Sequence, residues 1–384
     1  MLTSNINFKN FKIKKIKNIK NFINEIWFKK IKFLDSLRSN YKYNYTKSQI
    51  RKFKKNKNFR IIGMGGSTLG TEAIYQFLNH KIKKKFMFIN NLNPSLKNNE
   101  KKIKATNIII SKSGNTLETI VNSNLFIDQK KKIFITENKN SYLKNLATNL
   151  KAEIIDHKNY IGGRYSVLSE VGMLPAEIMG LNEKKFKRLN YLINNRNFLN
   201  ELIKNVSAIL NFVKQKKFNS IILNYDIKSE NLFKWYQQLV AESLGKKSKG
   251  ILPVVSTMPT DNHSLLQLYL DGPKNNFFTF FSTQDLKSDK INNKFLYKSH
   301  NYLRNKSFSK IINAQKFATQ KVFQKKKLPF RSFDIKTRNE EVLGELFSFF
   351  ILETILLGRA LKVNPFDQPS VELIKKETKK ILLN

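Results

Sequence analysis

The chain of 384 residues contains no cysteine, which excludes disulfide bonds and thiolate metal sites and fits a reducing compartment. Histidine occurs only four times, at scattered positions, so a metal site built from several histidines is not expected. No run of about 18 apolar residues occurs, and we expect no membrane-spanning helix. The N-terminal stretch is too rich in lysine for a secretory signal. These absences predict a cytoplasmic protein without a metal.

Acidic residues are scarce, because 28 Asp and Glu stand against 71 Lys and Arg, for a formal net charge of +43. Such a charge could indicate nucleic-acid binding through the phosphates. It could also reflect codon bias, since Lys, Asn, Ile and Phe can all be encoded by A and T alone, and all four are abundant. The lysines are spread along the chain rather than gathered in one block. We favour codon bias and expect no specific nucleic-acid binding.

Strand-like and helix-like runs alternate along most of the chain. "FRIIG" leads into a glycine turn and then into the helical pattern "LGTEAIYQFLNH", and the same order recurs with an apolar strand at 107–110 and a helix from Thr116. Such repeats predict an α/β protein with parallel sheets flanked by helices. A helical stretch from about 183 to 214 separates two blocks of this kind. We expect four parts: N-terminal helical segment 1–50 with Trp27 and Phe28 as possible anchors, first domain 51–205, second domain 206–340 and C-terminal helices 341–384.

The first candidate site is the turn "IIGMGGSTLG" at 61–70. It fails the dinucleotide fingerprint, because Thr68 stands at the third glycine position and the next strand ends without an acid. It fails the Walker A pattern too, because Thr71 rather than lysine follows Gly70. A glycine turn before a helix N-terminus suits a phosphate or a sugar hydroxyl. The alternative is a tight turn that needs a positive φ angle.

A second turn, "SKSGNTLET" at 111–119, also lies between a strand and a helix. It offers three hydroxyls, one ammonium group and the free N–H groups of a helix start, which together suit a phosphate. The alternative is an ordinary N-cap, with Thr116 as the cap and Glu118 behind it. Two such turns on adjacent parallel strands meet at the carboxyl edge of the sheet, where open α/β sheets bind ligands.

Three further segments carry candidate side chains. Arg164 follows a glycine pair and could lie against an anion, although a lone arginine is usually a surface residue. Gln238 and Glu242 are four residues apart and share one face of a helix, where a half-buried Glu242 could act as a base; the alternative is a glutamate in solvent. His263 lies in the first turn of a helix that Thr260 or Asp261 would cap, although a lone histidine is more often structural.

Six segments, in this order, resemble the glucose-6-phosphate isomerase family, also called phosphoglucose isomerase. They are "GMGGSTLG", "SKSGNTLET", "GGRYSVLSEVGMLPA", "QLVAESLGK", "TDNHSLLQLYLDGP" and "NPFDQPSVELIKK". The resemblance spans roughly 60 to 380, nearly the whole chain. It implies two sugar-isomerase, flavodoxin-like domains with a parallel five-stranded sheet each. It also implies reversible conversion of glucose 6-phosphate to fructose 6-phosphate without a metal or another cofactor.

The resemblance further implies which residues bind the substrate. Gly66 and Ser67 would line the sugar site, with Gln238 and Gln368 nearby. The phosphate would be bound by the hydroxyls and the ammonium group of the second turn: Ser111, Lys112, Ser113 and Thr116.

The catalytic roles also follow from the resemblance. Glu242 would be the base that moves a proton between C2 and C1, and Arg164 would stabilise the enediolate. His263 and Lys375 would serve ring opening, although Lys375 taken by position alone reads as a surface lysine. In the family the histidine reaches the site from the neighbouring subunit, which implies a homodimer.

Two alternatives remain open. The chain could be an isomerase of the same superfamily that also accepts mannose 6-phosphate. It could instead be a non-catalytic sugar-phosphate-binding protein that uses the same cleft for regulation. Such a regulator would not be expected to keep all of the catalytic side chains together: Arg164, Glu242, His263 and Lys375.

Overall fold

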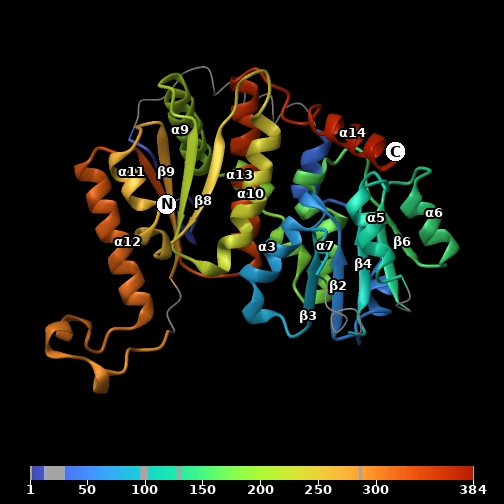
Figure 1. Ribbon diagram of the computed structural model, residues 1–384, viewed down its shortest axis with the longest axis horizontal. Helices are drawn as coiled ribbons and strands as arrows, with labels where there is room; N and C mark the ends of the chain where they lie inside the picture. Colours follow the sequence, from blue (N-terminus) through green and yellow to red (C-terminus); the bar gives the residue numbers. More distant parts are fainter. Residues whose placement is uncertain (1, 13–30, 96–102, 128–130, 285–287, 384) are drawn as a thin grey trace.

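The computed structural model describes residues 2–12, 31–95, 103–127, 131–284 and 288–383. It has two five-stranded sheets, with the helices α3 (Leu69–Phe77), α10 (Glu230–Leu244) and α13 (Glu340–Ala360) between them (Figure 1). One hydrophobic core connects both sheets, and it runs from Phe59 in one to Phe333 in the other. The expected α/β class, with parallel sheets flanked by helices, is confirmed. None of the helices in the described part of the chain is long and apolar enough to span a membrane.

The first sheet is parallel throughout, with the strand order β3-β2-β4-β5-β6. Its strands are β2 (Asn58–Ile62), β3 (Lys85–Ile89), β4 (Thr106–Ile110), β5 (Lys132–Thr136) and β6 (Glu153–Asp156). Its helices, besides α3, are α5 (Leu117–Asn124), α6 (Tyr142–Asn149) and α7 (Glu170–Met179). β3 and β4 lie on opposite sides of β2, so the strand order reverses between β2 and β4, and the carboxyl ends of these two strands are where an open α/β sheet usually binds its ligand.

The second sheet has the order β1-β10-β9-β7-β8. Its strands are β1 (Ile6–Lys9), β7 (Asn219–Asn224), β8 (Leu252–Thr257), β9 (Asn276–Thr283) and β10 (Phe330–Ile335). Four of them are parallel, but β1 pairs antiparallel with β10 at the edge. The expectation of a wholly parallel second sheet is therefore wrong.

The prediction of a helical N-terminal segment is also wrong for residues 6–9, which form the strand β1. Ile6 and Phe8 alternate with the more exposed Asn7 and Lys9, and this period of two buries one side of a strand. The ring of Phe8 packs 4.5 Å from that of Phe333, which holds the strand on the sheet. Further along, the described residues of the segment form a 3-10 turn, η1 (Lys32–Leu37), and a short helix, α2 (Lys47–Arg51). The proposed anchors Trp27 and Phe28 lie outside the described residues.

The remaining helices include the two expected at the end of the chain, α13 and α14 (Val371–Leu383). The others are α8 (Leu189–Ile193), α9 (Arg196–Lys214), α11 (Leu266–Asp271) and α12 (Phe308–Lys325). Because α9 is continuous, the expected boundary between 205 and 206 falls inside a helix. Short 3-10 turns connect the elements: η2 (Gly65–Ser67), η3 (Asn79–Lys81), η4 (Gly163–Leu168), η5 (Glu183–Phe186), η6 (Ile227–Ser229), η7 (Thr260–His263), η8 (Asn293–Phe295) and η9 (Lys298–Leu303).

Candidate active site

The candidate site lies at the carboxyl edge of the first sheet. The two polar turns leave β2 and β4 at this edge, and η4 follows β6. The last turns of α10 bring Gln238 and Glu242 to the same place, and the loop 364–368 arrives after α13. Segments that are far apart in the sequence therefore meet in one cluster.

The glycine turn packs closely against the neighbouring segments of the site. Gly65 has a φ angle of +53°, and a Cβ there would lie 2.7 Å from Nε2 of Gln238. A Cβ on Gly66 would lie 2.6 Å from the backbone nitrogen of Arg164 and closer still to the carbonyl of Gly163. The positive φ confirms that the turn needs glycine for its backbone. Ser67 lies half-buried on the same turn.

Arg164 is the centre of the cluster, and its side chain is only 2% exposed. A buried guanidinium must be fully hydrogen-bonded, and all five of its N–H groups donate. Nε donates to Ser243 Oγ (2.9 Å), Nη1 to Glu242 Oε2 (3.0 Å) and Gln368 Oε1 (2.8 Å), and Nη2 to the carbonyls of Pro365 (2.8 Å) and Asp367 (3.0 Å). The alternative of a surface arginine is therefore wrong.

Glu242 lies between two donors, and its side chain keeps 30% of its surface exposed. Gln238 donates from Nε2 to Oε1 (2.9 Å), while Arg164 donates to Oε2. These charge-assisted hydrogen bonds fix the carboxylate, yet one edge of it is open to a molecule in solution. The buried Oε1 of Gln238 accepts no hydrogen bond from the described residues.

The hydroxyls of the second turn face one another. Ser111 Oγ lies 2.9 Å and Ser113 Oγ lies 3.5 Å from Thr116 Oγ1, and Gly114 has a φ angle of +69°. Thr116 is the N-cap residue of α5, but its side chain makes no capping hydrogen bond. Thr116 thus takes the N-cap position, with Glu118 in the first turn behind it, but its hydroxyl does not cap the helix and lies beside the two serine hydroxyls instead.

Lys112 does not join these hydroxyls. Its Nζ donates to the carbonyl of Asn159 (2.7 Å) and lies 3.6 Å from Oε1 of Glu137. Partial burial lowers the pKa of Lys112, and the ammonium of Lys139 and the guanidinium of Arg164 act in the same direction. The ammonium thus lies beside the turn, held by the loop that follows β6.

The structure does not bring His263 and Lys375 to the cluster. His263 is exposed at the end of η7, at the carboxyl edge of the second sheet. Lys375 lies on α14, exposed and paired with Glu372 at 2.6 Å. Within the described residues, neither side chain is recorded in contact with Arg164 or Glu242. The expected helix cap beside His263 is wrong, because the carboxylate of Asp261 instead accepts hydrogen bonds from Thr257 N (2.9 Å) and Ser264 Oγ (2.8 Å).

Sequence reasoning missed two residues of the cluster, Tyr165 and Ser243. Tyr165 OH lies 2.8 Å from Ser243 Oγ and donates to the carbonyl of Pro365 (2.8 Å). Tyr165 directly follows Arg164 in the sequence, and Ser243 directly follows Glu242, and both of these neighbours were predicted site residues. That adjacency was the one signal available, because neither residue type marks a site by itself.

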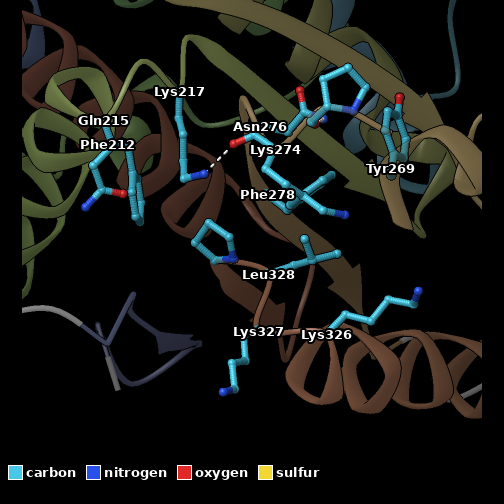
Figure 2. Close-up of a pocket in the computed structure, with 12 residues that line it drawn as sticks. Phe212, Gln215, Lys217, Tyr269, Lys274, Asn276, Phe278, Lys326, Lys327 and Leu328 are labelled. Atoms are coloured by element: carbon cyan, nitrogen blue, oxygen red, sulfur yellow. Dashed lines mark hydrogen bonds between the residues drawn. The ribbon is translucent and has the colours of Figure 1, made fainter. Parts of the chain in front are cut away.

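The cavity in Figure 2 lies elsewhere, at the amino edge of the second sheet. It has a volume of about 330 Å³ and a floor of buried apolar side chains that includes Phe278. Its polar rim is largely lysine, from Lys217, Lys274, Lys326 and Lys327. None of the predicted site residues lines it. Among the described residues, no group of three or more His, Asp or Glu could hold a metal ion.

Comparison with known proteins gives one consistent result. The family model described as phosphoglucose isomerase matches residues 16–384. A glucose-6-phosphate isomerase from Mycoplasmopsis pulmonis is 33% identical, over 88% of this chain and 88% of that protein. A probable glucose-6-phosphate isomerase from Methanococcus maripaludis is 31% identical, over 90% of this chain and 82% of that protein.

Solved structures share the fold. A hypothetical protein from Thermus thermophilus superposes with a TM-score of 0.83 at 22% identity, over 95% of this chain and 94% of that one. A glucose-6-phosphate isomerase from Chlamydia trachomatis superposes with a TM-score of 0.72 at 20% identity, over 87% of this chain and 72% of that one.

Proposed function

The chain belongs to the phosphoglucose isomerase family, and on that basis we propose that the cluster around Arg164 and Glu242 is its active site. The chain interconverts glucose 6-phosphate and fructose 6-phosphate, a reversible aldose–ketose isomerisation of glycolysis and gluconeogenesis. The sugar ring opens, and a proton then moves between C2 and C1 through an enediolate.

The observation that carries the proposal is the pairing of a buried guanidinium with a partly exposed carboxylate, 3.0 Å apart. A C–H group beside a carbonyl is weakly acidic, so its removal needs a positioned base and a cation or dipole at the developing oxyanion. Glu242 is the base in this account, and Arg164 stabilises the oxyanion. Both roles need the side chains close together, as they are here.

Substrate must exchange hydrogen bonds with Arg164, because all five of its N–H groups are already engaged. Two of these N–H groups are on Nη1, and they donate to side chains at the exposed edge of the Glu242 carboxylate, namely Glu242 itself and Gln368. We propose that a sugar oxygen takes over one of these N–H groups. Release of Oε2 from Arg164 would leave the Glu242 carboxylate free to accept the proton.

The second turn is the proposed phosphate site. Its three hydroxyls gather at the N-terminus of α5, where backbone N–H groups and the helix dipole favour an anion. Lys112 lies beside it and adds positive charge, while Gly66 and Ser67 line the path to the sugar. Binding energy from the phosphate, remote from C1 and C2, would orient the reacting carbons.

Ring opening by His263 and Lys375 is proposed to need a second copy of the chain, with His263 reaching the partner's site. A surface that supports this homodimer is the arm 289–307, which projects from the body beside α12 (Figure 1, orange). It exposes Phe295 (76%), Tyr297 (83%) and Tyr302 (69%). Large exposed aromatic side chains are enriched at protein–protein interfaces.

The proposed location of the protein in the cell is the cytoplasm.

The test is a coupled assay in which purified protein converts fructose 6-phosphate and the glucose 6-phosphate formed is measured. Turnover of about 1 to 1,000 per second, the usual range for enzymes, is expected. Mannose 6-phosphate in a parallel assay separates strict from relaxed sugar specificity. Binding of sugar phosphate without any turnover would contradict the proposal and favour a regulatory binding protein.

A further inference from the structure

We infer that Tyr165 and Ser243 are positioning residues, which close a hydrogen-bonded ring around Arg164 and so set the direction of its guanidinium toward the enediolate. The inference rests on the proposed function, since it concerns how the proposed oxyanion-stabilising group is held. Neither side chain is recorded in a hydrogen bond with Glu242, so both would act through Arg164.

The ring has four members and four hydrogen bonds. Arg164 Nε donates to Ser243 Oγ (2.9 Å), and Ser243 Oγ lies 2.8 Å from Tyr165 OH. Tyr165 OH donates to the carbonyl of Pro365 (2.8 Å), and the same carbonyl accepts from Arg164 Nη2 (2.8 Å). The ring therefore ties η4, α10 and the loop after α13 together at one guanidinium.

Only one arrangement of protons satisfies the ring. Arginine can only donate and a carbonyl can only accept. Ser243 Oγ therefore accepts from Arg164 and donates to Tyr165, which donates to Pro365. All four residues are buried, and burial raises the pKa of Tyr165, so its hydroxyl keeps the proton that it must donate. A ring in which every polar atom is satisfied has no competing orientation inside the protein.

The ring determines which part of the guanidinium meets the substrate. The group is planar and its donors form a rigid fork, so fixing Nε and Nη2 also fixes Nη1. Nη1 then points to Glu242 and Gln368, through two part-buried hydrogen bonds that a sugar oxygen can replace. Oxyanion stabilisation depends on donors that are already oriented before the reaction. Loss of the ring should thus slow the chemical step more than it weakens substrate binding.

The chain offers a matched pair of control residues. Ser256 Oγ lies 2.7 Å from Tyr269 OH, and both are buried in the second half of the molecule, away from the cluster. Tyr165→Phe removes only the hydroxyl oxygen. The aromatic ring, which packs against Phe33 (5.4 Å) and Phe366 (5.9 Å), is kept in the variant. The same change at Tyr269 removes an equivalent buried hydroxyl.

The experiment compares kcat and KM for Tyr165→Phe and Ser243→Ala with those for Tyr269→Phe and Ser256→Ala. We expect kcat to fall by about 10- to 100-fold in the first pair, with KM within about threefold of wild type. The control pair should stay within about twofold of wild type. Ring variants that are no slower than the controls would overturn the inference.

A double-mutant cycle separates positioning from general loss of structure. If the ring acts through Arg164, Tyr165→Phe should cost less than about threefold in kcat when Arg164→Lys is already present. A full, additive loss in that background would contradict the inference. Wild-type turnover distinguishes the two levels: an inactive wild type overturns the proposed function together with the inference, whereas an active wild type with unaffected ring variants overturns the inference alone.

Discussion

Arg164 connects distant stretches of chain through side-chain and backbone acceptors, and this could not be predicted from the residues around it. The motif after the glycine pair indicated an anion contact, but its acceptors at 242–243 and 365–368 lie far along the chain. Pairings between residues so far apart leave no local pattern in a sequence. The order of the six motifs predicted Glu242 and Gln368, whereas the ring residues became visible only in the structure.

His157, also at residue scale, predicts a pH effect on stability. It is buried directly after β6, and its Nδ1 donates to the carbonyl of Lys158 (2.9 Å). Burial lowers the pKa of His157 to about 4, from 6.5. Between these two values the unfolded chain binds a proton that the folded protein does not, so the free energy of unfolding falls as the pH drops from about 6.5 toward 4. The loss contributed by His157 by about pH 4.5 is about 2 kcal/mol.

Urea unfolding at about pH 7 and about pH 4.5 measures this contribution. The carboxylates titrate equally in wild type and variant, so His157→Asn should lose about 2 kcal/mol less than wild type between the two pH values. His300→Asn, at an exposed histidine, should change like wild type. Equal losses in His157→Asn and wild type would contradict the burial argument.

At the scale of elements, the strands of both blocks were largely predictable, because short apolar runs end in polar or glycine turns. β1 was not, since its four residues sit in a lysine-rich stretch that reads as helical and its partner β10 lies near the other end of the chain. The site depends on turns rather than strands. The turns η2 and η4 pack backbone against backbone, where Gly66 faces Gly163.

A pair of glycine substitutions tests that approach. In Gly66→Ala the new Cβ would lie 2.6 Å from the backbone of Arg164, so η2 or η4 must move. We expect a loss of about 2 kcal/mol or more in the free energy of unfolding, with kcat falling as Arg164 shifts. In Gly163→Ala the nearest atom would be Gly66 Cα at 4.0 Å, and the cost should stay below about 1 kcal/mol. Similar unfolding energies for the two variants would refute the close-packing account.

At the scale of the whole molecule, the main finding is that His263 does not reach the cluster around Arg164 and Glu242 within a single chain. The sequence resemblance implied a second subunit, and the exposed aromatic arm fits one. The 71 basic residues gave no comparable information, because lysines spread along the whole chain follow the composition rather than a site.

Complementation between inactive variants tests the shared site. Glu242→Gln and His263→Ala should each be nearly inactive, and unfolding and refolding them together allows mixed dimers to form. If His263 acts across the interface, a mixed dimer holds one intact site, and a random mixture should regain about a quarter of wild-type activity. Sedimentation should give twice the chain mass of 45.0 kDa. Absence of any recovery in a dimeric mixture would show that His263 does not act in the partner's site.

The most direct test of the central claim is the Glu242→Gln variant in the coupled assay, with deuterium exchange from solvent into the sugar followed in the same samples. Glutamine keeps the shape and accepts from Arg164, but it cannot take up the proton. The account predicts that kcat falls by about a thousandfold, that exchange falls with it, and that KM changes little. Glu137→Gln, beside the phosphate turn, should keep most of its kcat. A Glu242→Gln variant that retains more than about a tenth of wild-type kcat would show that another group moves the proton.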